Sequence, residues 1–274
     1  MDLGGRIKYA QALISEDSEK AEILLSNSMP KHLYQYRSGL ARNTESNELF
    51  DIENLRMNEI RMSKASSFND PYDSLIFCNS KDIIYLNPNI KKECDITEDI
   101  INSVNEGFDY QELFYVSCFT EDFASMLMWS HYANRHMGFC VEYELQKLQQ
   151  VAPTPFPSMI RPVIYDNEEL NFMSLNFDQR ISLYPYIKSS EWSYEKEWRL
   201  AIKAVKAEGY DYSTCNGLSI YIGKPTGIYM GTRIDKNNND LIDSLFSYCK
   251  NDKVRLYRMK IDYENIMLKP ILVN

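Results

Sequence analysis

The sequence has no apolar run close to the ~20 residues that would cross a bilayer, and residues 1–6 lack the basic and then apolar pattern of a secretory signal peptide. Its six cysteines form no Cys-x-x-Cys pair, so neither a zinc knuckle nor a redox motif is indicated. The Gly-x-Ser-x-Gly elbow of serine hydrolases is also missing. These absences predict a cytoplasmic protein whose cysteines are small buried apolar residues.

Basic charge is scarce as well. The chain has 30 basic and 39 acidic residues, and its net charge of −9 disfavours nonspecific binding of nucleic acid or of an anionic membrane. We therefore expect a small molecule or a protein as the partner. With 274 residues, 20 of them Tyr and 12 Phe, the chain can bury a full core. We expect a helical segment over residues 1–29 and a single domain over residues 30–274.

One helix has clear start and stop signals. Thr120 is predicted to cap a helix over residues 120–134, because Glu121 and Asp122 then lie in its first turn, where acidic groups favour the helix dipole. Gly138 is expected to follow that helix as a left-handed cap.

The most informative stretch is Trp192–Arg199, because it places charge where a purely structural strand would avoid it. Alternation along a strand puts Glu195, Glu197 and Arg199 on one face. The other face carries apolar side chains, which are Trp198, Leu200 and Ile202. Carboxylates and a guanidinium between aromatic rings can form a partly dried cluster with shifted pKa values. The alternative is a solvent-facing strand with ion pairs worth ~0–1 kcal/mol each.

Three further groups are candidate site residues. Arg37, after Tyr36 at the end of a predicted strand, can clamp a phosphate or a carboxylate, although an ordinary ion pair is more common. Ser117 lies on a buried strand, where most serines bond to the backbone. Trp129 and His131 form an aromatic and imidazole cluster at a helix end, where His131 is either catalytic or structural.

Six motifs follow one another along the chain: Leu33-Tyr34-Gln35-Tyr36-Arg37-Ser38, Phe68-Asn69-Asp70-Pro71-Tyr72-Asp73, Val116-Ser117-Cys118-Phe119, Met128-Trp129-Ser130-His131-Tyr132-Ala133, His136-Met137-Gly138-Phe139-Cys140-Val141-Glu142 and Trp192 to Arg199. Together, and in this order, they resemble domain of unknown function family 2971, a bacterial family, over roughly residues 30–265. That family supplies no established chemistry.

A more distant resemblance is to ADP-ribosyltransferase folds. Arg37, Ser117 and the Glu195-x-Glu197 pair follow one another in the order of that family's NAD-gripping residues. The Ser-Thr-Ser of the arginine-type enzymes is Ser117-Cys118-Phe119 here. The resemblance implies that residues 30–274 form a single α+β catalytic-like domain with a split, mostly antiparallel sheet and flanking helices. It also implies NAD as the substrate, cleaved in a bacterial toxin or phage-defence effector.

The same resemblance implies roles for individual residues. Arg37 would neutralise the pyrophosphate of NAD, with Ser117 beside it in the cleft. Glu197 would bond the ribose 2′-hydroxyl and stabilise an oxocarbenium-like transition state, and Glu195 would orient or deprotonate the acceptor. The expected nucleotide contacts are Tyr36, Arg37, Trp129, His131 and Arg199, with Tyr36 or Trp129 stacking on a ring. Because loss of a cleft carboxylate relieves repulsion as often as it breaks an ion pair, Glu197→Gln is expected to leave folding unchanged.

Two alternatives use the same residues. A metal-assisted nuclease or phosphodiesterase would use Asp70, Asp73, Glu195 and Glu197 as ligands of magnesium, with His131 as the base. A noncatalytic sensor would bind a nucleotide or a phage protein in the aromatic pocket. Turnover of NAD separates the NAD-cleaving enzyme, which requires no metal, from both alternatives. Dependence on magnesium separates the nuclease or phosphodiesterase from the sensor.

Overall fold

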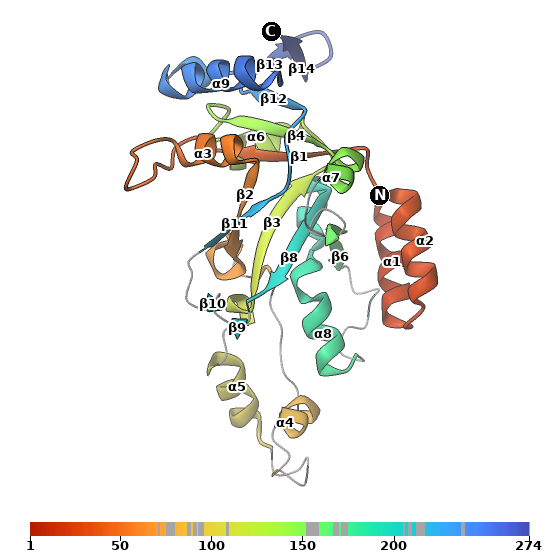
Figure 1. Cartoon of the computed structure of the whole chain (residues 1–274). Coiled ribbons are helices and arrows are strands. Elements are labelled where there is room, and N and C mark those ends of the chain that lie inside the picture. The colour runs from red at the N-terminus through yellow and green to blue at the C-terminus, as the bar shows by residue number, and fades with distance from the viewer. Residues whose placement is uncertain are drawn as a thin grey trace.

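The computed structural model describes residues 1–70, 72–74, 80–86, 89, 92, 96–107, 110–151, 159–166, 170, 175–204, 206, 207, 210, 211, 217–236 and 239–273. They form a mixed α/β domain around a ten-stranded sheet (Figure 1). The strands of this sheet are β1 (His32–Arg37), β2 (Glu59–Lys64), β3 (Phe114–Thr120), β4 (Phe139–Glu144), β5 (Arg161–Pro162), β8 (Glu197–Lys203), β11 (Gly217–Tyr221), β12 (Gly227–Met230), β13 (Arg255–Asp262) and β14 (Met267–Leu272). Two small sheets pair β6 (Ile164–Asp166) with β7 (Ile187–Ser189), and β9 (Lys206–Ala207) with β10 (Tyr210–Asp211).

Helices surround the sheet. The α-helices are α1 (Leu3–Ile14), α2 (Ser18–Ser28), α3 (Phe50–Met57), α4 (Ser80–Leu86), α5 (Glu98–Gly107), α6 (Met126–Tyr132), α7 (Leu145–Val151), α8 (Phe177–Leu183) and α9 (Asn239–Asp252). The 3₁₀ helices are η1 (Ala65–Ser67), η3 (Tyr110–Glu112), η6 (Tyr184–Tyr186), η7 (Ser190–Glu195) and η9 (Ile234–Lys236). Within the described ranges, none of the helices is long and apolar enough to cross a membrane.

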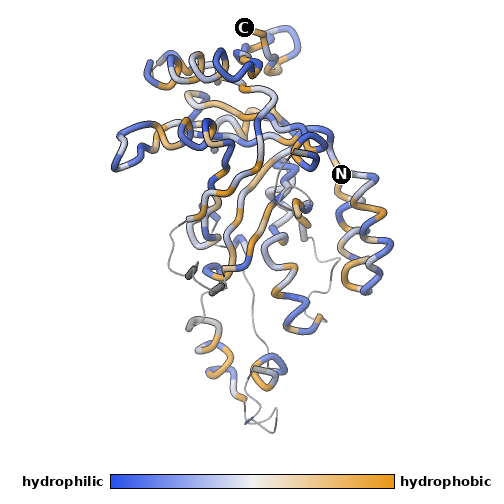
Figure 2. Tube along the Cα trace, in the orientation of Figure 1, coloured by the Kyte–Doolittle hydropathy of each residue, from blue (hydrophilic) through white to orange (hydrophobic). Residues whose placement is uncertain are grey.

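The large sheet runs in the order β11-β2-β3-β1-β4-β12-β13-β14, with β8 on β3 and β5 on β8. Only β12 with β13 and β6 with β7 pair in parallel among the described strands, which confirms the predicted mostly antiparallel arrangement. In Figure 1, β1 and β4 cross the upper part of the molecule, while β3 and β8 run down through its middle. Hydrophobic residues follow these central strands, whereas the loop before α3 is hydrophilic (Figure 2).

The sheet divides where β1 leaves β3. These two strands pair at Tyr34 and Thr120, and the same edge of β3 meets β2 at Tyr115 and Val116. Between those contacts, residues 117–119 of β3 line a cavity. The strand divergence therefore opens the sheet at its centre.

The charged strand covers Glu197–Lys203 and alternates as predicted. Trp198 and Leu200 are fully buried in the main core, while Glu197 and Arg199 face the other side. Glu195 does not belong to the strand: it ends η7, and Lys196 then adopts a left-handed conformation with φ 48° before β8 begins. The face predicted for Glu195 along this strand was therefore wrong, because Glu195 lies in a 3₁₀ helix and the positive φ of Lys196 interrupts the alternation of side chains.

The helix before β4 starts later than predicted. Its N-cap is Ser125, whose Oγ accepts from the Met128 N–H, whereas Thr120 ends β3. After α6 the chain has positive φ at three consecutive residues, 134–136, and Gly138 is not left-handed. Glycine is needed at 138 for another reason, because a Cβ there would lie 2.2 Å from the Arg37 carbonyl oxygen.

Gly138→Ala is expected to lower the free energy of unfolding by roughly 1–3 kcal/mol, the usual cost of forcing an extra methyl group into a packed site. The clash is with the backbone of β1, which cannot rotate away as a side chain can. Urea unfolding measures the change. Gly4→Ala is the control, because Gly4 is exposed in α1 and its nearest neighbour would lie 4.0 Å away. Equal stability of both variants would contradict the close approach.

Candidate functional site

The cavity at the divided sheet has a volume of about 430 Å³ and reaches from β1 and β2 across β3 to β8. It is lined by seven of the predicted site residues, which are Tyr36, Arg37, Ser117, His131, Glu195, Glu197 and Arg199. Its walls combine aromatic rings, guanidinium groups and carboxylates. We call this space the inner cavity.

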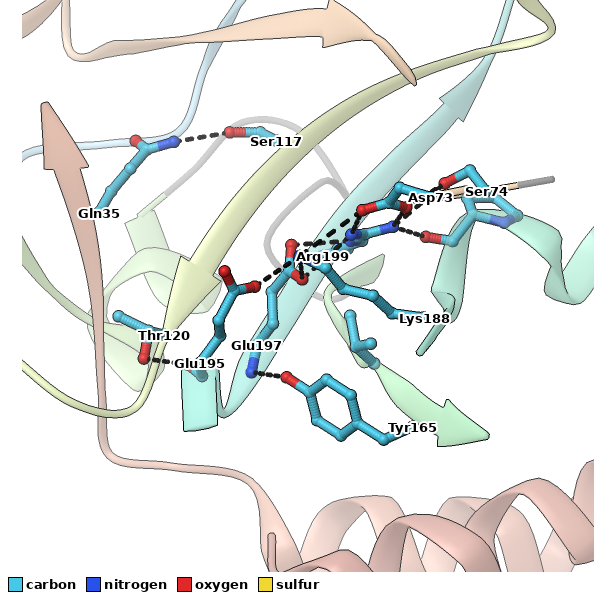
Figure 3. A network of polar contacts seen from close by, with 12 residues as sticks. Gln35, Asp73, Ser74, Ser117, Thr120, Tyr165, Lys188, Glu195, Glu197 and Arg199 are labelled. Atoms are coloured by element: carbon cyan, nitrogen blue, oxygen red, sulfur yellow. Dashed lines mark hydrogen bonds and ion pairs between the residues drawn. The ribbon is translucent and has the colours of Figure 1, made fainter. Parts of the chain in front are cut away.

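A buried ionic cluster forms the floor of the inner cavity, and Arg199 is its centre (Figure 3). Its Nη1 and Nη2 donate to Asp73 Oδ1 and Oδ2 at 2.7 and 2.6 Å, and its Nε and Nη2 donate to Glu197 at 2.8 and 3.0 Å. Nη1 also donates to the Pro185 carbonyl at 2.8 Å. A guanidinium has five N–H groups, so none is left for a ligand. Arg199 holds the cluster together and is not the nucleotide contact that the sequence predicted.

Lys188, on β7, joins the two glutamates. Its Nζ lies 2.5 Å from Glu195 Oε2 and 3.1 Å from Glu197 Oε2, while the Tyr132 hydroxyl donates to Glu195 Oε1 at 2.7 Å. Counting Asp73 with the two glutamates gives three carboxylates and two cations, and hence a net charge of −1 when all five are ionised.

The two glutamates of the pair differ in acidity. Burial and the charge of Glu197 raise the pKa of Glu195 above its ordinary value, despite Lys188. Burial acts in the same direction at Glu197, but Arg199 and Lys188 outweigh it and lower the pKa of Glu197 to about 2. Environments that push the pKa values of neighbouring carboxyl groups apart are typical of catalytic pairs, although ion-pair networks produce them too.

The backbone of Glu197 is fixed on both sides. Its N–H donates to the Tyr165 hydroxyl at 2.7 Å, and its carbonyl accepts from Arg6 Nη1 at 2.6 Å. The same nitrogen of Arg6 donates to the Val163 carbonyl at 2.8 Å. Helix α1 is thereby fastened to the strand that carries Glu197.

Ser117 and Glu197 leave the sheet on opposite faces. Ser117 pairs with Leu200 and Glu197 pairs with Thr120, three positions further along β3, and successive residues of a strand alternate between faces. Ser117 Oγ accepts from Gln35 Nε2 at 2.8 Å, and Gln35 Oε1 accepts from Arg37 Nη2 at 2.6 Å. Ser117 and Arg37 thus belong to one chain of hydrogen bonds that is separate from the carboxylates, although both groups line the inner cavity.

Of the aromatic and histidine side chains predicted to contact a nucleotide, two line the inner cavity and one does not. Tyr36 lines the inner cavity, with its hydroxyl donating to the Asp122 carbonyl at 2.8 Å, and His131 is an exposed lining residue. Trp129 is fully buried, its Nε1 donates to the Phe123 carbonyl, and its ring meets Tyr36 edge-on at 5.2 Å. The stacking role predicted for Trp129 is therefore wrong, because no face of its ring reaches the cavity; it supports Tyr36 from behind.

The sequence predictions did not include Lys188 or Arg61, both of which line the inner cavity. Lys188 lies on a three-residue strand, too short to show a period. The position of Arg61 could have been predicted from the pattern of its neighbours. Ile60 and Met62 on either side of it are buried in the main core, so the alternation of β2 points Arg61 to the opposite face.

Metal binding has little support in this geometry. Among the described residues, no three His, Cys, Asp or Glu side chains are placed to hold a metal ion. The carboxylates of Asp73, Glu195 and Glu197 are each bonded to Lys188 or Arg199 instead. Asp70 makes a local turn, with its Oδ1 accepting from the Tyr72 N–H.

Residues 128–200 match the model of a family described as "Protein of unknown function (DUF2971)". The match supports the family resemblance for the motifs from α6 to the charged strand, while the earlier motifs precede the matched range. No curated protein and no solved structure matches the chain. The likeness to ADP-ribosyltransferases stays a prediction.

Proposed function

We propose that the inner cavity binds NAD and that the protein cleaves its nicotinamide glycosidic bond, with ADP-ribose passing to a macromolecule or to water. The observation that carries this proposal is the meeting of Glu195 and Glu197 at one wall of a cavity that also holds Tyr36 and Arg37. A volume of about 430 Å³ lies within the range of small-molecule sites, roughly 300–1,000 Å³.

The charge of the cluster suits a reaction that creates positive charge. When the bond between C1 of the nicotinamide ribose and the pyridinium nitrogen breaks, its electron pair leaves with nicotinamide and the ribosyl carbon becomes cationic. With Glu195 ionised, the net charge of −1 on this buried wall stabilises that cation. Glu197 is the permanent part of this charge, because its pKa of about 2 keeps it ionised at any physiological pH.

Glu195 has the properties of a proton acceptor. As the acceptor oxygen bonds to C1, its proton passes to the Glu195 carboxylate, whose raised pKa makes it the more basic of the two. Tyr132 and Lys188 hold that carboxylate in place. Turnover should fall as the pH drops through the raised pKa of Glu195, because the protonated group no longer accepts.

Glu195→Gln is expected to reduce turnover of NAD about 100-fold, the lower part of the usual range for loss of a general base. The fold should survive, because burial already disfavours the ionised form that the substitution removes. Release of labelled nicotinamide from NAD measures turnover, and urea unfolding measures stability. Glu191→Gln is the matched control, since it removes the same charge from an exposed position of the same 3₁₀ helix.

The outcome separates the three hypotheses. No release of nicotinamide by the unchanged protein, with any acceptor or with water, would refute the glycosyl-transfer proposal. Magnesium-dependent cleavage of a phosphodiester would favour the nuclease instead, and ligand binding without turnover would favour the sensor. An NAD-consuming enzyme should also slow growth of a bacterial host that expresses it, which is the behaviour proposed for a toxin or phage-defence effector.

A further inference from the structure

A second hollow adjoins the inner cavity. It has a volume of about 480 Å³ and shares four of its lining residues, Tyr36, Arg37, Arg61 and Tyr132, with the inner cavity. Its remaining lining residues are Ser38, Ala41, Arg42, Phe50 and Asp51. We call it the outer groove. Three of its nine lining side chains are guanidinium groups and one is a carboxylate, an excess of positive charge on a protein whose net charge is −9.

The three arginines are not equally available. Arg37 donates to Gln35 and lies 3.5 Å from Asp51, while Arg42 pairs with Asp240 at 2.9 Å. Arg61, in contrast, has no carboxylate within salt-bridge distance among the residues that the structure describes. It is therefore the cation on the shared wall of the two spaces whose charge is not already balanced by a neighbour.

Packing holds Arg61 in place instead of a counter-ion. Its guanidinium lies 5.2 Å from the centre of the Phe50 ring, in cation–π contact. On the other side it rests against Gly217 of the neighbouring strand β11, where a Cβ would lie 2.2 Å from Nη2. A side chain positioned by packing keeps its N–H donors for a ligand and loses little freedom on binding.

We propose that Arg61 is the binding group of a diphosphate subsite at the junction of the inner cavity and the outer groove. The class of ligand is a nucleoside diphosphate or a dinucleotide, whose phosphate oxygens accept the paired N–H groups of the guanidinium. The inference deepens the proposed function and rests on it for the identity of the dinucleotide. It moves the main pyrophosphate contact from Arg37, which the sequence indicated, to Arg61.

The position of Arg61 assigns each half of such a ligand to one space. With the diphosphate at the junction, the half that carries the scissile bond lies in the inner cavity, where Glu195 and Glu197 are. The other nucleoside lies in the outer groove, whose lining includes Phe50 and Tyr132.

The test measures binding of ADP and of inorganic pyrophosphate by isothermal titration calorimetry. Arg61→Ala is expected to raise the Kd of both probes at least about tenfold, since a hydrogen bond to a charged group contributes roughly 1.5–3 kcal/mol. Gly217→Ala is expected to weaken both as well, although it keeps the charge, because the new methyl group displaces the guanidinium. Arg61→Lys should restore only part of the affinity, because an ammonium lacks the planar pair of donors.

Arg56→Ala is the matched control, because Arg56 is an exposed arginine on α3 that pairs with Glu48 and lines neither space. Unchanged Kd values in Arg61→Ala, losses in Arg56→Ala as large as those in Arg61→Ala, or no binding of either probe by the parent protein would each overturn the subsite. The diphosphate subsite and the cleavage of NAD can be tested separately. Arg61-dependent binding of ADP without release of nicotinamide would keep the subsite and refute the cleavage.

Discussion

Arg199→Met is expected to lower the free energy of unfolding by about 3–5 kcal/mol, the cost of removing one partner from a buried ion pair. The substitution leaves Asp73, Glu195 and Glu197 with Lys188 as the cation of the cluster, so the net charge changes from −1 to −2. Methionine fills much of the volume, and the loss therefore reports charge and hydrogen bonding more than packing. Urea unfolding at pH 7 measures it.

The pH dependence of this loss identifies its cause. The carboxylates left without Arg199 should protonate more readily, so the deficit relative to the parent protein should shrink as the pH is lowered. Arg56→Met, at an exposed position, should change stability by no more than about 0.5 kcal/mol. A deficit below 1 kcal/mol for Arg199→Met, or one that stays constant with pH, would show that the cluster is not held together by ionic contacts.

Glu197→Gln is expected to lower turnover of NAD by about 100–1,000-fold, the loss typical of removing one preorganised electrostatic group. It should also destabilise the fold by on the order of 3 kcal/mol, because lowering the pKa from its ordinary value of 4.5 to about 2 corresponds to that preference for the ionised carboxylate. The sequence predicted unchanged folding. The structure revises that expectation, since Glu197 is 3% exposed and is bonded to both cations of the cluster.

The free energy of unfolding measured at acidic pH checks this prediction independently. Because the folded pKa of Glu197 is depressed, its contribution is complete above about pH 4.5 and is lost as the pH falls toward 2. The parent protein and Glu197→Gln should therefore converge in stability across that interval. If Glu197→Gln turned over NAD within a few-fold of the parent at matched amounts of folded protein, the role of the cluster would be structural and not catalytic.

The sequence was sufficient for features that depend on local periodicity. Alternation along residues 197–203 correctly separated the apolar Trp198 and Leu200 from Glu197 and Arg199. The mostly antiparallel sheet was implied by a fold resemblance and did not come from local periodicity. The likeness of the motifs to a family of unknown function is supported between residues 128 and 200.

The sequence failed where partners are distant in the chain. Arg199 was assigned to a ligand because nothing local shows that Asp73, 126 positions earlier, occupies it. Trp129 was assigned to stacking because a helical pattern does not tell which aromatic ring lies behind another. The start of α6 was misplaced because Thr120 and Ser125 are both good caps, and pairing of Thr120 with Glu197 on β8 decided between them.

The two hydrogen bonds that fix the backbone of Glu197 also bear on how the cavity wall would behave when a ligand binds. Tyr165 accepts from the amide N–H of Glu197, and Arg6 donates to its carbonyl oxygen, so each of the two peptide planes that flank Glu197 can turn only by breaking one of these contacts. A ligand of the proposed site would therefore meet a wall that is already formed and does not rearrange on binding. The energy of binding is not spent on arranging this wall, and the electric field that meets the ligand is already set before it arrives.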